Sequence, residues 1–322
     1  MYDGFVRSIA QTWLLLLLGP ALAIVLSNVL LHRSAWYSWM LRQQIPGSIF
    51  AAEGESYRAW QEGVHLDRVL IGNSLALRNI DEERLDEAMG GRTLNLGING
   101  IDLASVAMMV PDVIALRPAV VVLTVGPFEL NDSLLPAFRR YYHPAVAMEL
   151  YGTDVRYAPS EHLNGLALWS SRLYRHQPGL KAVALILLGQ RHPIRQHPRD
   201  EPALSSTEMR LRLRQRRIEL NEVRLTGVGH NVDAIQVIHR RLTAADIPLV
   251  VMPMPAHPEL VEGGYHVVVL DVLTALQAEL NFSLIPPHRM EGIEAADFQD
   301  PLHLAGPGQI KITAILAESL AP

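Results

Sequence analysis

The segment Arg68-Val-Leu-Ile-Gly-Asn-Ser-Leu-Ala-Leu77 sets the interpretation of the whole chain. Its apolar run, residues 69–71, is typical of a parallel strand that is buried on both faces. Gly72 and Asn73 end the run, and the residues after Ser74 can start a helix. A serine in such a turn holds its hydroxyl at the carboxyl end of the strand, where ligands bind in open α/β sheets. Ser74 is therefore a candidate nucleophile, although a Gly-Asn-Ser turn by itself is also an ordinary turn.

Apolar strand patterns alternate with helical patterns on the carboxyl side of this segment. Strands separated by helices predict a parallel sheet with helices on both faces, a three-layer α/β/α fold. We expect strands at 67–71, 93–96, 118–124, 248–253 and 282–285. We expect helices at 75–89, at 102–116 with an interruption at Pro111, at 235–245, at 268–280, and from Gly306-Pro307 to about Leu320.

Three further polar motifs follow the predicted strands. Leu94-Asn-Leu-Gly-Ile-Asn-Gly100 follows the second strand, and Gly126-Pro-Phe-Glu-Leu-Asn-Asp132 follows the third. Asp300-Pro-Leu-His303 follows the last strand and precedes the last helix. Because the carboxyl ends of parallel strands meet at one edge of the sheet, we expect these motifs to converge on Ser74.

In these four blocks the chain resembles the SGNH (GDSL-like) hydrolase superfamily, over residues 66–132 and 247–320. The blocks of that family are a serine turn, a glycine, a Gly-x-Asn-Asp element and a terminal Asp-x-x-His. The resemblance implies a flavodoxin-like SGNH hydrolase fold and chemistry on ester bonds. Serine needs a neighbouring base to become a nucleophile. His303 is the candidate base, and Asp300 would hold its imidazole in the useful tautomer.

The resemblance also implies an oxyanion hole, which stabilises the negative charge of an attacked ester. Its donors would be the backbone N–H groups of Ser74 and Gly97 and the side chain of Asn131. Two departures from the family pattern concern this region. Four residues separate Gly126 from Asn131 where the family has one, so Asn99 is an alternative donor. Asn73 stands where the family usually has aspartate. His257, after another strand, either lines the substrate site or is an ordinary loop residue.

The N-terminal residues predict a membrane anchor at 1–33. Ile9–Leu31 is a run of 23 residues without a charge, and about 20 suffice to cross a hydrocarbon core. A cleaved signal peptide ending at Ala21-Leu-Ala23 is the alternative, but the apolar run continues beyond that site. We expect a single-pass protein with its catalytic domain, residues 66–322, extracytoplasmic. The region 34–65 reads as a juxtamembrane stalk whose aromatic residues lie at the headgroups or pack on the domain: Trp36, Tyr37, Trp39 and Trp60.

Residues 133–247, here called the insertion, interrupt the alternation of strands and helices. A segment of this length is too long for a loop and predicts a helical cap. Residues 172–224 hold 12 Lys and Arg against 5 Asp and Glu. Within them, Lys181–Leu188 is an apolar segment with basic borders, which suits either an anionic membrane surface or a buried cap helix. Met209–Arg224 is a basic helix that faces lipid headgroups, an acidic glycan or only solvent.

Composition and motifs narrow the function. The chain has no cysteine, which excludes disulfides and thiolate metal sites, and its net charge of −5 does not indicate a nucleic-acid partner. No metal-ligand spacing and no glycine-rich phosphate loop occur, so we expect no metal and no cofactor.

Three functions remain. The first is an anchored esterase or O-acyltransferase that takes an acyl-ester donor and a cell-envelope glycan or lipid acceptor. The second is a secreted lipase or esterase. The third is a non-catalytic protein of the same fold that assists a membrane-bound acyltransferase partner.

Overall fold

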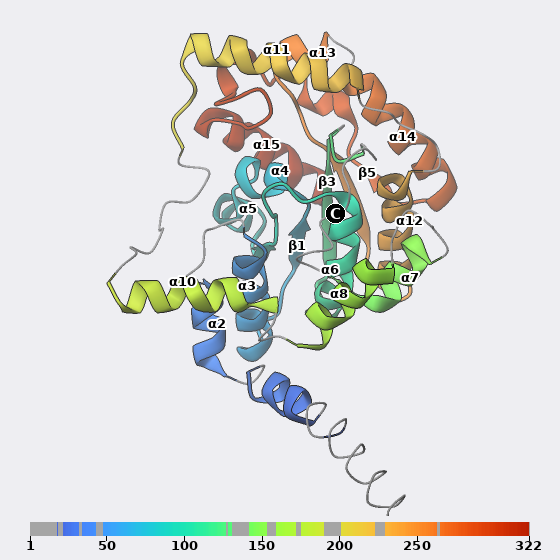
Figure 1. The fold of residues 1–322 in the computed structure, drawn as a ribbon. Coiled ribbons are helices and arrows are strands. Elements are labelled where there is room, and N and C mark those ends of the chain that lie inside the picture. The colour runs from blue at the N-terminus through green and yellow to red at the C-terminus, as the bar shows by residue number, and fades with distance from the viewer. Residues whose placement is uncertain are drawn as a thin grey trace, which may run out of the picture.

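The computed structural model describes residues 18, 22–31, 34–42, 48–126, 128–130, 142–152, 159–171, 175–189, 201–222, 229–262 and 265–321. Its centre is a five-stranded sheet, entirely parallel, in the order β2-β1-β3-β4-β5 (Figure 1). The strands are β1 (Arg68–Ile71), β2 (Thr93–Asn95), β3 (Val120–Val125), β4 (Leu249–Pro253) and β5 (Ser283–Leu284). The predicted parallel α/β sheet is thereby confirmed.

Successive strand residues point to opposite faces of the sheet and enter two separate hydrophobic clusters. Val69 and Val121 belong to the first cluster, whereas Leu70 and Val122 belong to the second. The first is covered by α3 (Ile49–Gln61), α6 (Leu103–Ala115), α7 (Pro144–Tyr151), α12 (His230–Thr243) and α14 (Tyr265–Leu280). The second is covered by α4 (Ser74–Asn79), α5 (Glu82–Met89) and α15 (Gly306–Leu320) (Figure 1). Helices on both faces bury β1 and β4 at every position and β3 at all but its first, which explains the continuous apolar sequence of these three strands.

The strand order creates a switch point between β1 and β3. From β1 the chain moves outward to β2, then returns to the other side of β1 to add β3, β4 and β5. This is the order of the flavodoxin-like class, in which the crevice at the carboxyl ends of the two central strands is the usual ligand site. Ser74 follows β1, and residues 126–130 follow β3.

Two predicted helices differ in the structure. The helix expected at 75–89 is two helices, α4 and α5, because Ile80 is extended and the side chain of Asp81 caps the second by accepting from Arg84 N. The interruption expected at Pro111 is absent, since α6 continues through it. Proline in a helix costs about 3 kcal/mol. Burial of the apolar side chains along α6 outweighs that cost.

Part of the region predicted to be a stalk, residues 34–65, packs against the domain. The helices α2 (Ala35–Arg42) and α3 pack on each other, and Ile49 and Ala52 of α3 belong to the first cluster. A buried chain of side-chain contacts joins them to the insertion: Tyr37 Oη to His176 Nδ1, and His176 Nε2 to Glu53. Of the four aromatic residues, Tyr37 packs inside, whereas three are exposed: Trp36, Trp39 and Trp60.

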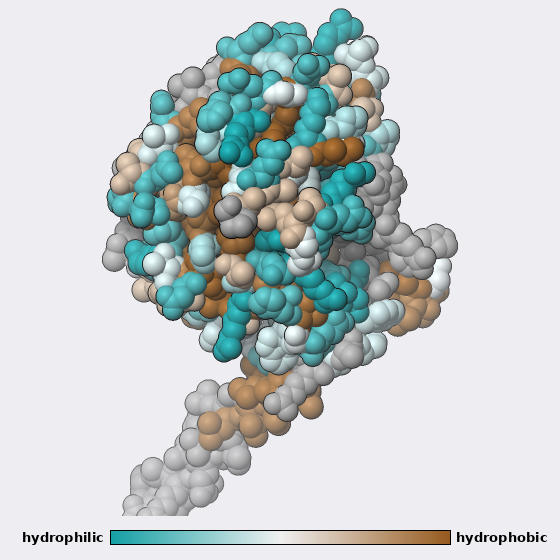
Figure 2. Space-filling view, turned by 180° about the vertical axis from the view of Figure 1, so that it is seen from behind, coloured by the Kyte–Doolittle hydropathy of each residue, from teal (hydrophilic) through white to brown (hydrophobic). Residues whose placement is uncertain are grey.

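Most of the anchor expected at Ile9–Leu31 lies outside the described residues. Residues 22–31 are helical and carry exposed apolar side chains, visible on the projecting segment in Figure 2. In the part of the chain that the structure describes, no helix is both long enough and apolar enough to cross a membrane.

Where the structure describes it, the insertion is mostly helical. Of its helices, α7 and α12 pack against α6 and help cover the sheet. The others are α8 (Pro159–Ser170), α10 (Gln177–Leu187) and α11 (Ser206–Glu222). In α10, Val183 is buried while Leu187 is exposed. Figure 1 shows α11 beside α13 (Pro258–Val261), across the edge of the domain where the strands end.

Candidate active site

The side chains of Ser74, His303 and Asp300 meet at the carboxyl edge of the sheet. His303 Nε2 lies 2.8 Å from Ser74 Oγ, and His303 Nδ1 lies 2.7 Å from Asp300 Oδ2. The serine and the histidine are 229 positions apart in the sequence. Their contact therefore depends on how β1 and the loop before α15 are placed, and the convergence predicted for them is found.

The serine turn is shaped by the residues on either side of β1. Gly72 has a φ of 145°, and a Cβ on it would lie 2.2 Å from Thr124 Oγ1, so no other residue fits at this place. Asn73 caps α4, because its side-chain oxygen accepts from Leu75 N at 2.7 Å. Ser74 is thus the first residue of a helix that begins immediately beyond the strand.

The loop that carries His303 is fixed mainly by Asp300. One carboxylate oxygen accepts from the backbone N–H groups of Leu302 and His303, both at 2.9 Å, and the other faces the imidazole. Burial by itself raises the pKa of Asp300, but these hydrogen bonds and the adjacent imidazole lower it to about 2. Asp300 is consequently ionised at neutral pH and favours the tautomer in which Nδ1 carries the proton.

Asn79 is a buried residue that the sequence analysis did not single out. It lies at the C-terminal end of α4 and is fully buried. Its Nδ2 donates to Leu302 O at 3.2 Å, and its Oδ1 accepts from Leu304 N at 2.9 Å. Asn79 thereby holds the backbone on both sides of His303. One short helix carries Ser74 at one end and the support of His303 at the other.

Gly97 lies against the serine helix. A Cβ on Gly97 would lie 2.5 Å from Leu77 N and 2.9 Å from Asn73 O, so glycine is needed for this close approach. Its N–H, the expected oxyanion donor, donates to Asn95 Oδ1 at 3.0 Å in this structure. The alternative donor Asn99 is exposed. Asn131 lies outside the described residues.

Glu129 was also not singled out by the sequence, although it belongs to the block after β3. Its side chain is buried, and its Oε1 accepts a hydrogen bond from Asn73 Nδ2. Burial raises the pKa of Glu129 to about 7, against the lowering effect of backbone amides and of the positive charge of Arg216 on α11. A single glutamate in an otherwise mixed segment carries no pattern by which it could have been found.

His257 supports the histidine loop from the outside. Its backbone N–H donates to Pro301 O at 3.0 Å, and its ring packs on Phe298. Its Nδ1 accepts from Glu259 N, which caps α13. These contacts account for His257 as a loop residue.

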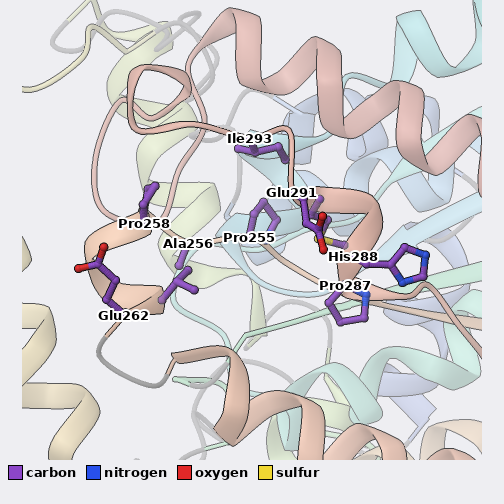
Figure 3. A pocket seen from close by; sticks show the side chains of 10 residues that line it. Pro255, Ala256, Pro258, Glu262, Pro287, His288, Glu291 and Ile293 are labelled. Carbon is purple, nitrogen blue, oxygen red and sulfur yellow. The ribbon is translucent and has the colours of Figure 1, made fainter.

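A groove of about 440 Å³ lies beyond this loop (Figure 3). Figure 3 shows Pro258 and Glu262 on one wall and His288 and Glu291 on the other. The groove is lined mainly by apolar side chains and does not include the three residues of the Ser74 cluster. Across the described ranges of the chain, no three His, Asp or Glu side chains are close enough to hold a metal ion.

The arrangement can transfer one proton. In this geometry His303 Nε2 can accept the Ser74 hydroxyl proton. The positive charge that the imidazole then carries is stabilised by the negative charge of ionised Asp300. The deprotonated Oγ of Ser74 can then attack a carbonyl carbon that is bound at the carboxyl ends of the strands.

Comparison with known proteins adds little to this geometry. No protein-family model matches the chain, and no curated protein matches it. A solved structure titled "Crystal Structure of TesA" is similar to this chain with a TM-score of 0.41 and 13% sequence identity. The similarity covers 79% of this chain and 98% of that one.

Proposed function

We propose that the protein is a serine esterase or O-acyltransferase of the SGNH type, with Ser74 as nucleophile, His303 as base and Asp300 as the residue that orients the base. The observation that carries the proposal is the pair of contacts at His303, 2.8 Å to Ser74 and 2.7 Å to Asp300. Both distances lie within the range needed for general-base activation of a hydroxyl.

The reaction proceeds in two steps. Ser74 Oγ attacks the ester carbonyl as its proton passes to His303 Nε2, and the same proton then leaves with the alcohol group of the donor. The acyl group stays on Ser74 as an ester. In the second step water or a sugar hydroxyl attacks this ester while His303 takes its proton, and His303 then returns that proton to Ser74 Oγ as the serine leaves the acyl group. The N–H of Ser74 lies in the first turn of α4, where amides lack an intrahelical acceptor, and supplies one oxyanion donor.

The physiological setting in the proposal comes from the resemblance and the N-terminal sequence. The apolar run at Ile9–Leu31 would anchor the chain, with the catalytic domain extracytoplasmic and acting on acyl esters of a cell-envelope polysaccharide or lipid. The basic residues of α11 would face an acidic glycan or lipid headgroups. A membrane-bound acyltransferase would be the partner if the acyl group is relayed from another protein.

A serine-directed fluorophosphonate probe and a nitrophenyl acetate assay test the chemistry. Ser74→Ala and His303→Ala should each lower turnover by about 10³-fold or more while the protein stays folded. Ser206→Ala, at an exposed serine of α11, is the matched control and should be labelled like wild type. Labelling that persists in Ser74→Ala would show that the wrong serine was chosen. Acetyl transfer to an added glycan would separate an acyltransferase from a hydrolase.

The non-catalytic alternative makes the opposite prediction. A protein that only binds a membrane acyltransferase would not react with the probe, and its wild type and Ser74→Ala forms would behave alike. The longer separation of Gly126 and Asn131 is the sequence feature that favours this alternative.

A further inference from the structure

The carboxyl group of Glu129 meets the residue that immediately precedes the proposed nucleophile. Glu129 lies on the loop after β3, and 6% of its surface is exposed. Its Oε1 accepts from Asn73 Nδ2, while its Oε2 has no hydrogen-bond partner among the described residues. A buried carboxyl in contact with the serine turn needs a reason, because removing it from water is costly.

The orientation of the Asn73 amide is determined by its two partners. Its oxygen accepts from Leu75 N at 2.7 Å, so its nitrogen must be the atom that faces Glu129. The amide therefore joins two structures: on one side the start of α4, on the other the loop after β3. Any shift of this amide moves the cap of the helix whose first residue is Ser74.

We propose that Glu129 is a positioning residue for Ser74, which acts by fixing the Asn73 amide that caps the serine helix. This inference rests on the proposed function. It also accounts for asparagine at position 73. An aspartate there could still cap α4, but its second oxygen would face an oxygen of Glu129. Two carboxylate oxygens are both acceptors, so they form a hydrogen bond only if one of the two groups is protonated.

The surroundings of Glu129 are compatible with this role. Arg216 of α11 is the charged side chain that acts on Glu129 from the helix packed above, and it lies over the Phe128 ring at 5.0 Å. The backbone amides of Gly126 and Glu129 also lower the pKa of this carboxyl. Asn73 is neutral, so the contact with the serine turn holds whether or not Glu129 carries a proton.

Substitutions that exchange the amide of Asn73 and the carboxyl of Glu129 test the proposal in the full-length protein. Asn73→Asp alone should lower kcat for nitrophenyl acetate at pH 8 by tenfold or more, since two carboxylates then face each other. Adding Glu129→Gln should restore kcat to within about fivefold of wild type, because the glutamine amide can donate to Asp at position 73. Glu129→Ala should lower kcat by tenfold or more, and Glu129→Gln, which keeps an oxygen acceptor, by less. KM should change less than threefold throughout.

The controls separate positioning from stability and from the proposed function. Melting temperatures give the folded fraction of each variant, and Glu83→Gln, at an exposed position of α5, controls for loss of a carboxylate. If Asn73→Asp does not fold, recovery of folding and kcat in the double variant still supports the pairing. A double variant no better than Asn73→Asp, or a Glu129→Ala variant with wild-type kcat, overturns this inference alone. A wild-type protein that neither turns over nor reacts with the fluorophosphonate probe overturns the proposed function and this inference together.

Discussion

At the scale of single residues, the site depends on polar side chains that each make two contacts. Asn73 caps α4 and meets Glu129, and Asn79 binds the backbone on both sides of His303. Asparagine suits both places because its amide is a donor and an acceptor at once. The serine and the histidine are thus held by the two ends of the same six-residue helix.

Asn79→Ala should impair both stability and turnover. The change leaves Leu302 O and Leu304 N buried without partners, which we expect to cost about 2–4 kcal/mol of unfolding free energy. Because His303 lies between those two residues, its imidazole should lose its alignment with Ser74. We expect kcat to fall at least tenfold in protein that is still folded. Urea unfolding and probe-labelling rates measure the two effects, and a labelling rate equal to wild type would contradict the alignment role.

At the scale of elements, α11 connects the insertion to the edge of the sheet where the strands end. Its Leu213 and Leu220 are buried in the second hydrophobic cluster, while Leu211 is exposed. In addition to this packing, Arg217 of α11 forms an ion pair with Glu259 of α13 at 3.0 Å. An ion pair this exposed contributes at most about 1 kcal/mol. The helix is therefore held in place mainly by the buried apolar stripe formed by Leu213 and Leu220.

Leu213→Ala should therefore destabilise the protein far more than Leu211→Ala. Truncating a buried leucine leaves a cavity and costs about 2–5 kcal/mol, whereas an exposed leucine of the same helix should change stability by less than about 0.5 kcal/mol. Thermal unfolding of the two variants provides the comparison. Equal melting temperatures would mean that α11 is not docked through this stripe.

At the scale of the whole molecule, the half-buried carboxyl group of Asp300 and the buried carboxyl group of Glu129 influence stability in opposite pH ranges. The pKa of Asp300 is lowered to about 2, so its ionised form stabilises the fold above pH 4, and this contribution is lost as the pH falls from 4 to 2. The pKa of Glu129 is raised from 4.5 to about 7, so the folded state holds an extra proton between these values. The contribution of protonated Glu129 to the free energy of unfolding is fully present below pH 4.5 and is lost as the pH rises to 7.

Glu129→Gln should remove the second of these effects. A pKa raised by this amount corresponds to about 3 kcal/mol at high pH, most of which is lost between pH 5 and pH 8. We expect the difference in unfolding free energy between these two pH values to be about 2 kcal/mol smaller in the variant than in wild type. Urea unfolding at both pH values measures it. An unchanged difference would mean that Glu129 titrates as an exposed carboxyl does.

Much of the fold can be predicted from the sequence because buried parallel strands have a distinct composition. The run 69–71 and the β-branched run before Thr124 are apolar at every position, and their strands lie within two residues of the expected bounds. Two local predictions failed, the first because packing outweighed the cost of a proline and the second because the Asp81 cap starts a new helix. Pro111 did not interrupt α6, and Ile80 broke a helix that the apolar spacing had joined.

By itself, the sequence determined the alternation of strands and helices, the placement of Ser74 after a strand and the Asp-x-x-His spacing that lets one loop hold both partners. These are local properties, since they depend on side chains a few positions apart. The tertiary structure decided which distant groups touch: His303 with Ser74, Asn79 with the His303 loop, and Glu129 with Asn73. Glu129 meets Asn73 because the sheet order places β1 beside β3, and His303 meets α4 because α15, which follows its loop, packs against that helix. A lone buried polar residue has no periodicity that would reveal it.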